Sequence, residues 1–560
     1  MGLIMRKHIK RQLAFITTWA MLGGFLASSP GAGASGRSDE AVVSAPVGTI
    51  EGVQKDDVLV FKGIPYAAAP IGEKRWQPPV PFPDWEGLRK AKKFGPACIQ
   101  PKSRPGSIYA EDYAAMSENC LSLNVWTKQG AKNAPVLVWI HGGSLMTGAG
   151  STQIYDGARM AGKGLVVVTI NYRLGILGYF AHPELSAESN LGISGNYGLQ
   201  DQIEALRWVK RNIAAFGGDP DNVTIAGESA GALSVMYLMA SPPAHGLFGK
   251  AIVQSAYMIS TPSLKEERFG HPALEAIGQS VQEKLGAANI AEMRAIGPHD
   301  LTARAPQTGF APFGVVDGHF LPRQIAETFD RGEQAQAPVL AGFNEGEIRS
   351  LRFLLPPKPS DASDYEERIR SGYGELADLY LTLYPSDNME ESMLAATRDA
   401  MYGWTAERLV SRQSGLGLPS YLYMFDHGYP AADENGLHAF HAAEIPYVFG
   451  TLKNTSAQWP KIPRTARERE LSDNMMNYWV SFARNGTPVA ADAPSWPAYS
   501  EGKSAMVFAN KPKAIAGLSG QRYALHEEVV CRRMATGDMQ WNWNVGIISP
   551  PLPSVSKDCR

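Results

Sequence analysis

The pentapeptide Gly227-Glu228-Ser229-Ala230-Gly231 is the clearest chemical signal in the sequence. Its pattern, G-x-S-x-G, is typical of a nucleophile elbow, a tight turn that joins a strand to a helix. The two glycines relieve crowding in that turn. The turn raises the serine hydroxyl above the sheet and directs the amino end of a helix towards it, where negative charge is stabilised. A strand-like run, Val223–Ala226, and a helical pattern, Ala232–Met239, flank the motif. We therefore predict that Ser229 is a nucleophile.

A second glycine-rich segment fits the same chemistry. A serine that attacks an ester carbonyl creates an oxyanion, which preorganised backbone N–H groups stabilise. His141-Gly142-Gly143-Ser144 directly follows the strand-like run Val136–Ile140. Glycines there let the backbone approach a ligand closely. An ordinary turn at a strand end is the alternative, but together with the elbow the segment predicts an oxyanion loop.

Short apolar runs separated by helical patterns indicate the fold that must position these residues. Strand-like runs of this kind are Val136–Ile140, Leu165–Ile170, Val223–Ala226, Ala251–Val253, Val339–Ala341 and Tyr421–Phe425. Apolar residues recur at three- and four-residue steps from Leu199 to Phe216, which predicts an amphipathic helix. This alternation predicts an α/β class with a mostly parallel central sheet and helices on both faces. We expect 260–335 and 350–420 to be large helical insertions over the carboxyl ends of the strands.

Composition excludes some classes of partner. The chain has 560 residues, 44% of them hydrophobic and 19% charged, which is ordinary for a soluble globular enzyme. The formal net charge is −2, so no basic field attracts nucleic acid or an anionic membrane surface. We expect neither nucleic acid nor a membrane as a stable partner. The oligomeric state is not encoded in any visible pattern.

The amino-terminal residues have the features of an export signal. A basic start at Arg6–Arg11 precedes the apolar run Leu13–Ala27, and Ala32-Gly33-Ala34 suits cleavage. The apolar run is short for a bilayer span, although an amino-terminal membrane anchor stays open. We predict a signal peptide over 1–34, a linker over 35–47 and a secreted or periplasmic protein.

The four cysteines agree with export. Their spacings contain no C-x-x-C, so we expect no metal site. An even number in an exported chain predicts the sequence-local disulfides Cys98–Cys120 and Cys531–Cys559. The other two connectivities and buried free thiols remain open.

Further blocks around these motifs resemble the type-B carboxylesterase family, which includes para-nitrobenzyl esterases and cholinesterases. The blocks are Phe61–Ala67, Glu118–Val125, Asn171–Gly175, Asn196–Gln202 and Phe216–Pro220. The resemblance runs from about residue 44 to about 545 and is weakest over 250–335 and 350–430. It implies an α/β-hydrolase domain, which we place at 48–545 with a carboxyl-terminal tail at 546–560. It also implies a small-molecule ester substrate and no cofactor.

The family uses a Ser–Glu–His triad in that chain order. Its acid lies in a G-x-N/T-x-x-E pattern, which Gly342–Glu347 matches, so the resemblance assigns Glu347. Glu345 is the minor alternative because the usual Asp-Glu-Gly is replaced here. Its histidine opens a block like His441–Phe449, so His441 is the expected base and His438 is the competitor.

By the same resemblance, the oxyanion donors are the backbone N–H groups of Gly143, Ser144 and Ala230. The family has a third glycine where this chain has Ser144, and an aromatic residue where it has Leu145. Both departures put the shape of the loop and of the adjacent pocket in doubt.

Several other residues receive a structural interpretation. We expect Glu228, Arg173 and Glu444 to be buried ion-pair partners that hold loops. Tyr402 and Trp404 could line an acyl or alcohol pocket, although tryptophan is as often core.

These observations predict a carboxylic ester hydrolase that acts through an acyl-enzyme, in which His441 moves the proton and Glu347 holds the imidazole. A carbamate or amide hydrolase or an acyltransferase with the same triad is the alternative. A non-catalytic, neuroligin-like adhesion protein is less favoured because all three triad residues are retained. The ester itself is not predicted.

Overall fold

The computed structural model describes residues 40–557 and 559. The predicted signal peptide, 1–34, and the first part of the predicted linker lie outside the described residues. Among the described residues, every helix is too short or insufficiently apolar to cross a membrane.

One large sheet organises the chain. In the described residues it contains thirteen strands in the order β1-β2-β3-β7-β9-β8-β10-β11-β12-β13-β14-β15, with β4 beside β2, while β5 and β6 pair separately. All neighbours from β9 to β14 are parallel, and the other pairs along this order are antiparallel, whereas β4 pairs parallel with β2. The strands are β1 Glu40–Ala45, β2 Gly48–Lys55, β3 Val58–Pro65, β4 Leu88–Lys90, β5 Ala97–Cys98, β6 Met116–Ser117, β7 Ser122–Lys128, β8 Ala134–Ile140, β9 Val166–Ile170, β10 Gly218–Glu228, β11 Lys250–Gln254, β12 Val339–Asn344, β13 Ser420–Phe425, β14 Ser504–Phe508 and β15 Pro512–Ala516.

The six strand-like runs of the sequence all belong to the parallel centre of this sheet, as β8 to β13. Strand β8 shows why they are continuously apolar. Its Val136, Val138 and Ile140 join the core on one face of the sheet. Its Leu137 and Trp139 join the core on the other face. A parallel strand buried on both faces has no polar side, which removes the alternation of a half-exposed strand.

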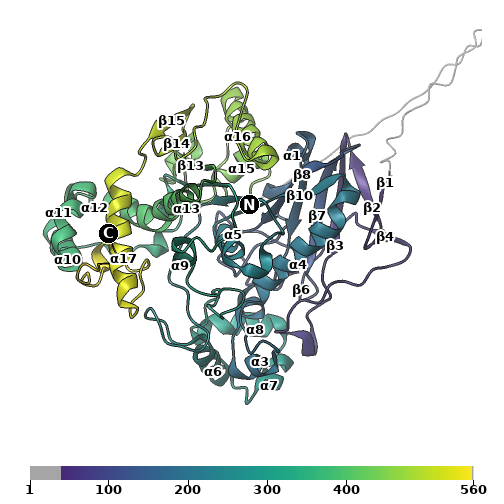
Figure 1. The fold of residues 1–560 in the computed structure, drawn as a ribbon, viewed down its shortest axis with the longest axis horizontal. Coiled ribbons are helices and arrows are strands. Elements are labelled where there is room, and N and C mark those ends of the chain that lie inside the picture. The colour runs from purple at the N-terminus through teal and green to yellow at the C-terminus, as the bar shows by residue number, and fades with distance from the viewer. Residues whose placement is uncertain (1–39, 558, 560) are drawn as a thin grey trace, which may run out of the picture. The chain divides into compact units, whose positions relative to one another are not determined.

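Helices cover both faces. Helices α4, α5 and α13 contribute to one core, and α15 and α16 to the other. Figure 1 shows α4 and α5 in front of the strands, and both views place α10, α11 and α12 beside α17. The helices are α1 Ala158–Gly162, α2 Gly175–Tyr179, α3 Pro183–Glu188, α4 Tyr197–Asn212, α5 Ala230–Ala240, α6 Leu274–Leu285, α7 Ile290–Ala295, α8 Pro298–Arg304, α9 Ile325–Asp330, α10 Ala362–Tyr373, α11 Ala377–Leu383, α12 Met389–Arg398, α13 Trp404–Gly415, α14 Pro430–Glu434, α15 Ile445–Phe449, α16 Ala466–Asn485 and α17 Gly520–Thr536.

The helix expected over Leu199–Phe216 is α4 together with a 3₁₀ turn, Ile213–Phe216. It ends at Gly217, whose φ of 81° lies in the left-handed region that favours glycine. The two long insertions are largely helical as expected: α6 to α9 lie in the first, and α10 to α13 in the second.

The amino-terminal edge differs from the sequence-based expectation. Residues 40–45 were expected in the linker, but they form β1, which pairs antiparallel with β2. The reason is that Gly48 permits a short connection at φ 139°, so the chain folds back on itself. A small polar segment can extend an edge strand because only one of its faces needs to be apolar.

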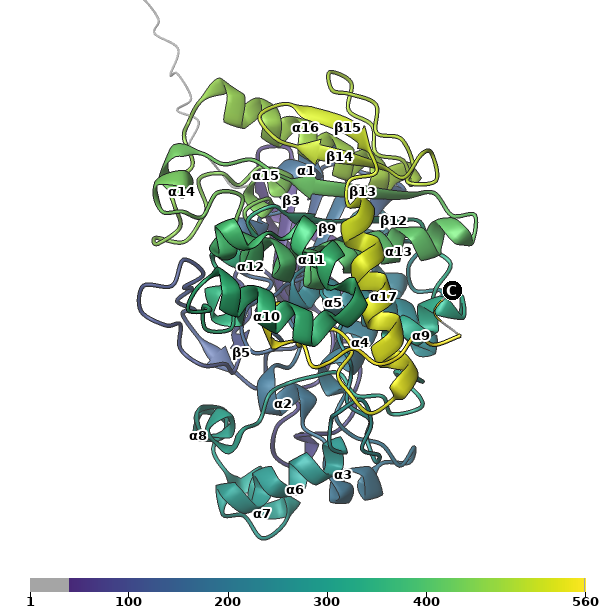
Figure 2. The same cartoon turned by 90° about the vertical axis from the view of Figure 1, so that its left-hand side faces the viewer.

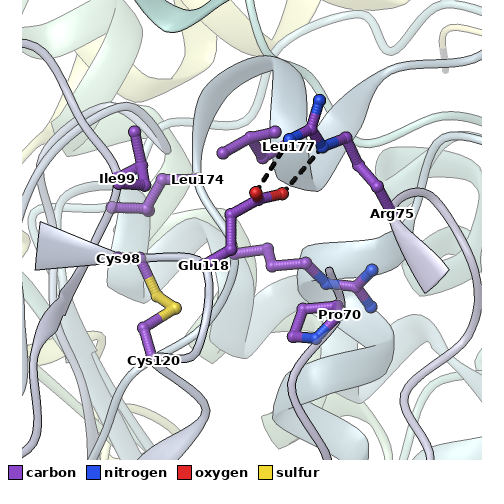
Figure 3. Close-up of a pocket in the computed structure, with 9 residues that line it drawn as sticks. Pro70, Arg75, Cys98, Ile99, Glu118, Cys120, Leu174 and Leu177 are labelled. Carbon is purple, nitrogen blue, oxygen red and sulfur yellow. Dashed lines mark hydrogen bonds and ion pairs between the residues drawn. A yellow bond between two sulfur atoms is a disulfide. The ribbon is translucent and has the colours of Figure 1, made fainter. Parts of the chain in front are cut away.

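Both predicted disulfides are present, Cys98–Cys120 and Cys531–Cys559. Figure 3 shows the first beside a fork-like pair between Arg75 and Glu118, with N–O distances of 2.7 and 2.8 Å. Both side chains are nearly fully buried. Removing one partner would leave an unpaired buried charge. Together the disulfide and the ion pair fix the loop that enters β7.

Candidate active site

Ser229 lies in the sharp turn that the sequence predicts. Strand β10 ends at Glu228 and helix α5 begins at Ala230, which leaves Ser229 at φ 55° and ψ −123°. This conformation is unfavourable for a residue with a side chain. It is held by the Ser229 N–H, which donates to the carbonyl of Gln254 at 2.9 Å. The result is a half-buried hydroxyl at the end of the central strand.

The flanking glycines are required by space. A Cβ at Gly227 would lie 2.5 Å from the backbone of Gly231. A Cβ at Gly231 would lie 2.1 Å from the carbonyl oxygen of Ile140. Both distances are far below van der Waals contact, so the G-x-S-x-G pattern is explained by packing of the elbow against β8.

The predicted oxyanion loop lies against the serine. A Cβ at Gly142 would be 3.2 Å from the Cβ of Ser229. The loop turns tightly because the N–H groups of Met146 and Thr147 both donate to the Gly143 carbonyl at 2.9 Å. Ser144 occupies the left-handed region at φ 56°. This explains the glycine that the resembling family has at this position, since glycine adopts that conformation without strain.

Three backbone N–H groups beside the serine are free to bind a ligand. Within the described residues, no group accepts a hydrogen bond from the N–H of Gly143, Ser144 or Ala230. The N–H of Ala230 is at the first position of α5, where no intrahelical acceptor exists. These are the three N–H groups that the sequence analysis predicts as oxyanion donors.

Glu347 and His441 form a buried pair. Glu347 follows β12 and is fully buried. Its Oε1 accepts from the Asn344 N–H at 2.8 Å, and its Oε2 is hydrogen-bonded to Nδ1 of His441. The two loops are joined by the Gly346 N–H, which donates to the Ala439 carbonyl at 2.8 Å. Each oxygen of Glu347 thus has a partner that fixes its direction.

The other imidazole nitrogen faces the elbow. Nε2 of His441 lies 3.1 Å from Oε1 of Glu228, the residue directly before Ser229. Within the described residues the Ser229 hydroxyl makes no hydrogen bond. Catalytic hydrogen bonds are often formed only when a ligand is bound. Two of the three predicted triad residues, Glu347 and His441, are therefore in direct contact, and the imidazole lies beside Glu228, the residue that precedes Ser229.

Burial and neighbouring carboxylates shift both pKa values. Burial disfavours the imidazolium of His441, but Glu228 and Glu347 outweigh it and raise the pKa of His441 to about 9. Burial raises the pKa of Glu228 to about 8, against the opposing effect of His441. The pKa is raised for both groups, so the pair of Glu228 and His441 retains protons at pH values where exposed groups would release them.

The three residues expected in ion pairs have different surroundings. Arg173 pairs with Asp201 at 2.7 Å, as expected. Glu444 has no cationic partner among the described residues: its oxygens accept from the amides of Gln254 at 2.8 Å and Asn344 at 2.7 Å. Glu228 pairs with the imidazole of His441 at 3.1 Å, and the raised pKa of that histidine favours its charged form. The expectation of an ion pair is therefore wrong for Glu444 only.

Glu345 and His438 belong to a separate cluster. The His438 ring nitrogens lie 3.0 Å from carboxylate oxygens of Asp426 and Asp433, and Glu345 accepts from Arg398 at 2.8 Å. Ligand atoms of Glu345, Asp426 and His438 lie within 4.8 Å of one another. Both imidazole nitrogens are already engaged by carboxylates, so neither offers a lone pair to a metal ion.

Aromatic residues flank the histidine. The Tyr402 ring centroid lies 5.4 Å from that of His441. Trp404 lies elsewhere, with its Nε1 donating to Glu527 at 2.7 Å. The Tyr109 hydroxyl lies 2.8 Å from the His441 carbonyl oxygen. Sequence reasoning missed Tyr109 because no motif surrounds it, and only the folded chain brings it to His441.

Comparison with known proteins gives the family. The model of the carboxylesterase family matches residues 39–526. The chain belongs to that family. Among its relatives, fumonisin B1 esterase of Sphingopyxis macrogoltabida is 36% identical over 484 residues, covering 84% of this chain and 87% of that protein. Para-nitrobenzyl esterase of Bacillus subtilis is 34% identical, covering 82% and 93%.

Solved structures agree with the fold of this carboxylesterase. A para-nitrobenzyl esterase structure matches with a TM-score of 0.74 and 32% identity, covering 86% of this chain and 99% of that chain. The predicted α/β-hydrolase class and the prediction of a serine carboxylesterase are confirmed.

Proposed function

We propose that this carboxylesterase cleaves carboxylic esters through an acyl-enzyme formed on Ser229. The main support is that three separate segments pack against the elbow or against one another. The elbow holds the serine hydroxyl, the oxyanion loop holds N–H groups with no acceptor among the described residues, and Glu347 holds His441 by Nδ1. Each of these is a requirement of acyl transfer.

In acylation, the Ser229 oxygen attacks the ester carbonyl carbon and its proton passes to Nε2 of His441. The carbonyl oxygen becomes an oxyanion that accepts from the N–H groups of Gly143, Ser144 and Ala230. The intermediate collapses when the bond to the alcohol oxygen breaks, and His441 returns the proton to that oxygen. Glu347 fixes the tautomer and stabilises the imidazolium.

In deacylation, a water molecule takes the place of the alcohol. His441 removes a proton from the water as its oxygen attacks the acyl carbon, and then returns that proton to Ser229. The acid product leaves and the free enzyme is restored. No cofactor is consumed in either half of the reaction, because the bond exchange is balanced by water alone.

The substrate is proposed as a small-molecule ester. The relatives named above are a fumonisin B1 esterase and a para-nitrobenzyl esterase, so the names of both relatives point to ester cleavage, on different substrates. A panel of acyl and aryl esters, together with matched amides and carbamates, will define the preferred bond. Cleavage of the amides or carbamates in preference to the esters would contradict the proposal.

The decisive variant is Ser229→Ala. We expect it to abolish hydrolysis of a short p-nitrophenyl ester, a loss of about 10⁴-fold or more, while the melting temperature stays near that of the wild type. An organophosphate should add one phosphoryl group to Ser229, detected by peptide mass spectrometry. Retained turnover in the variant, or labelling of another residue, would remove Ser229 as the nucleophile.

We also propose export to an oxidising compartment, as a secreted or periplasmic protein. Two disulfides support it, because such bonds persist outside the reducing cytosol. Fusion of residues 1–34 to a reporter enzyme tests the predicted signal peptide. Retention of the reporter in the cytosol would contradict export.

A further inference from the structure

A cavity of about 490 Å³ lies away from the residues of the candidate active site. Its lining comes from 76–79, from 185–193, from the first turns of α4, and from Pro243 and 319–320. None of the predicted triad or oxyanion residues lines it. Its volume falls within the range of about 300–1,000 Å³ that is typical of small-molecule sites.

The walls offer apolar surface to a ligand. Trp76 is 2% exposed and its indole N–H donates to the Ile176 carbonyl at 2.8 Å, so it supports the lining from behind without offering a free polar group. Leu191 is 56% exposed on the loop that follows α3. Phe320 lies in a different segment of the lining. Such walls suit an aromatic or aliphatic body.

A polar side chain in the lining lacks a partner. Gln200 is only 7% exposed, and among the described residues its side-chain amide has no hydrogen-bond partner. The nitrogen and oxygen of this amide are not fully enclosed, so water or a bound molecule can reach them. Because Gln200 lines the cavity, its amide is available to a molecule bound there.

The helix face that carries Gln200 also brings a positive charge, that of Arg207, to the cavity. Gln200, Ile203 and Arg207 are spaced by three and four residues on α4 and all line the cavity. Arg207 has a half-exposed side chain and a single long contact, 3.4 Å, with Glu204. Its guanidinium therefore still has N–H groups that can form a fork-like pair with a carboxylate.

Glu188, the acidic residue in the lining, is paired with an arginine that lies outside the lining. Glu188 accepts two hydrogen bonds from Arg294, at 2.8 and 2.6 Å. Arg294 itself does not line the cavity. The negative charge nearest to the cavity is thus already paired, whereas Arg207 is only weakly paired. This balance favours an anion over a cation as the occupant.

We propose that this cavity binds a small amphipathic carboxylate, with the apolar body against Leu191 and Phe320 and the carboxylate at Gln200 and Arg207. The proposal does not depend on the acyl-enzyme mechanism. The acid released by ester cleavage and an acid taken up from solution share this chemistry.

The test uses 2-naphthoate as the probe and the full-length Ser229→Ala enzyme, in which the active site is present but makes no acid. Isothermal titration should detect one site. Arg207→Gln should weaken it at least about tenfold, as expected for loss of one charge-assisted contact. The matched control is Lys210→Gln, which removes the same charge from the same helix at a residue that pairs with Asp221 outside the cavity.

Three further binding measurements test the proposed carboxylate site. Neutral 2-naphthamide should bind more weakly than 2-naphthoate, and equal affinities would remove the carboxylate contact. Leu191→Ser, on the exposed loop, should weaken binding without affecting folding. Wild-type enzyme blocked by an organophosphate should still bind the probe. Loss of binding on blocking, equal affinity in Arg207→Gln, or no binding at millimolar concentration would overturn the site.

The two sources of the acid are separated by a second probe set. If the product acid occupies the cavity, acids released from the best esters of the substrate panel should bind more tightly than 2-naphthoate, and Arg207→Gln should weaken them equally. If these acids bind only in the active site, organophosphate blocking will remove their binding and leave that of 2-naphthoate unchanged, which assigns the cavity to an external acid.

Discussion

Two histidines three residues apart have similar chemical partners and different surroundings. His441 lies between Glu347 and Glu228, and its side chain is 7% exposed. His438 lies between Asp426 and Asp433, and its side chain is 36% exposed. The pKa of each is raised to about 9. A raised pKa therefore does not distinguish the candidate base from its neighbour.

The difference lies in how each value arises. At His438 the hydrogen bond to Asp426 is the largest influence, and burial opposes it only in part. At His441 burial is the largest influence and lowers the pKa, so the surrounding carboxylates must overcome it. Water can replace a hydrogen-bond partner at the partly exposed His438 but not at the buried His441. We infer that substitutions around His441 act mainly on rate, and those around His438 mainly on stability.

The largest effect is expected from the acidic partner. Glu347→Gln should lower kcat/KM by about 10³–10⁴-fold, because an amide no longer fixes the tautomer or stabilises the imidazolium. Glu345→Gln, two residues away and bound to Arg398, should lower it less than about fivefold. Steady-state hydrolysis of a p-nitrophenyl ester measures both. The reverse order would move the acid of the triad to Glu345.

Glu228 lies on the side of the His441 ring opposite to Glu347, and its substitution tests how far carboxylates set the pKa of this histidine. Its carboxylate raises the pKa of His441, so Glu228→Gln should lower that pKa and move the acidic limb of the kcat/KM profile to lower pH. A charge at this distance shifts a pKa by about one unit or more. Profiles from pH 5 to 10 measure the shift. Asp426→Asn, the corresponding change at His438, should leave the profile in place, and a limb that moves equally in both variants would contradict the distinction.

The central strands and the elbow could be predicted from the sequence, whereas the edge of the sheet and the contacts around His441 could not. The six strands and the elbow were predictable because buried parallel strands are continuously apolar and because packing demands Gly227 and Gly231. The edge strand β1 was not, since a half-exposed strand with small residues resembles a linker. Tyr109 and the pairing of Glu228 with His441 were not predictable either, because they depend on contacts between loops far apart in the chain.

His438 offers a stability effect with a defined sign. Its pKa in the folded protein is raised to about 9 from an ordinary 6.5. Its ion pairs therefore stabilise the fold fully below about pH 6.5 and lose that contribution as the pH rises through about 9. His438→Gln should lower the free energy of unfolding by at most about 1 kcal/mol, because solvent screens a side chain this exposed. Thermal unfolding at pH 6 and pH 9.5 should show a difference only at the lower pH.

Rate provides the control for that variant. His438→Gln should keep kcat/KM within about threefold of the wild type, because partly exposed ion pairs such as those of His438 contribute little free energy to ester hydrolysis at Ser229. A large loss of rate without loss of stability would mean that His438, and not His441, is the base.

Salt gives the smallest and most selective effect. At 1 M salt the screening length is about 3 Å, so the exposed ion pairs of His438 should contribute almost nothing. The stability difference between the wild type and His438→Gln at pH 6 should then shrink towards zero. The rate difference between the wild type and Glu347→Gln should change less than about twofold, because Glu347 is fully buried and ions cannot enter between it and His441. Equal sensitivity of both differences to salt would show that solvent reaches both histidines, and burial would no longer distinguish the proposed base, His441, from His438.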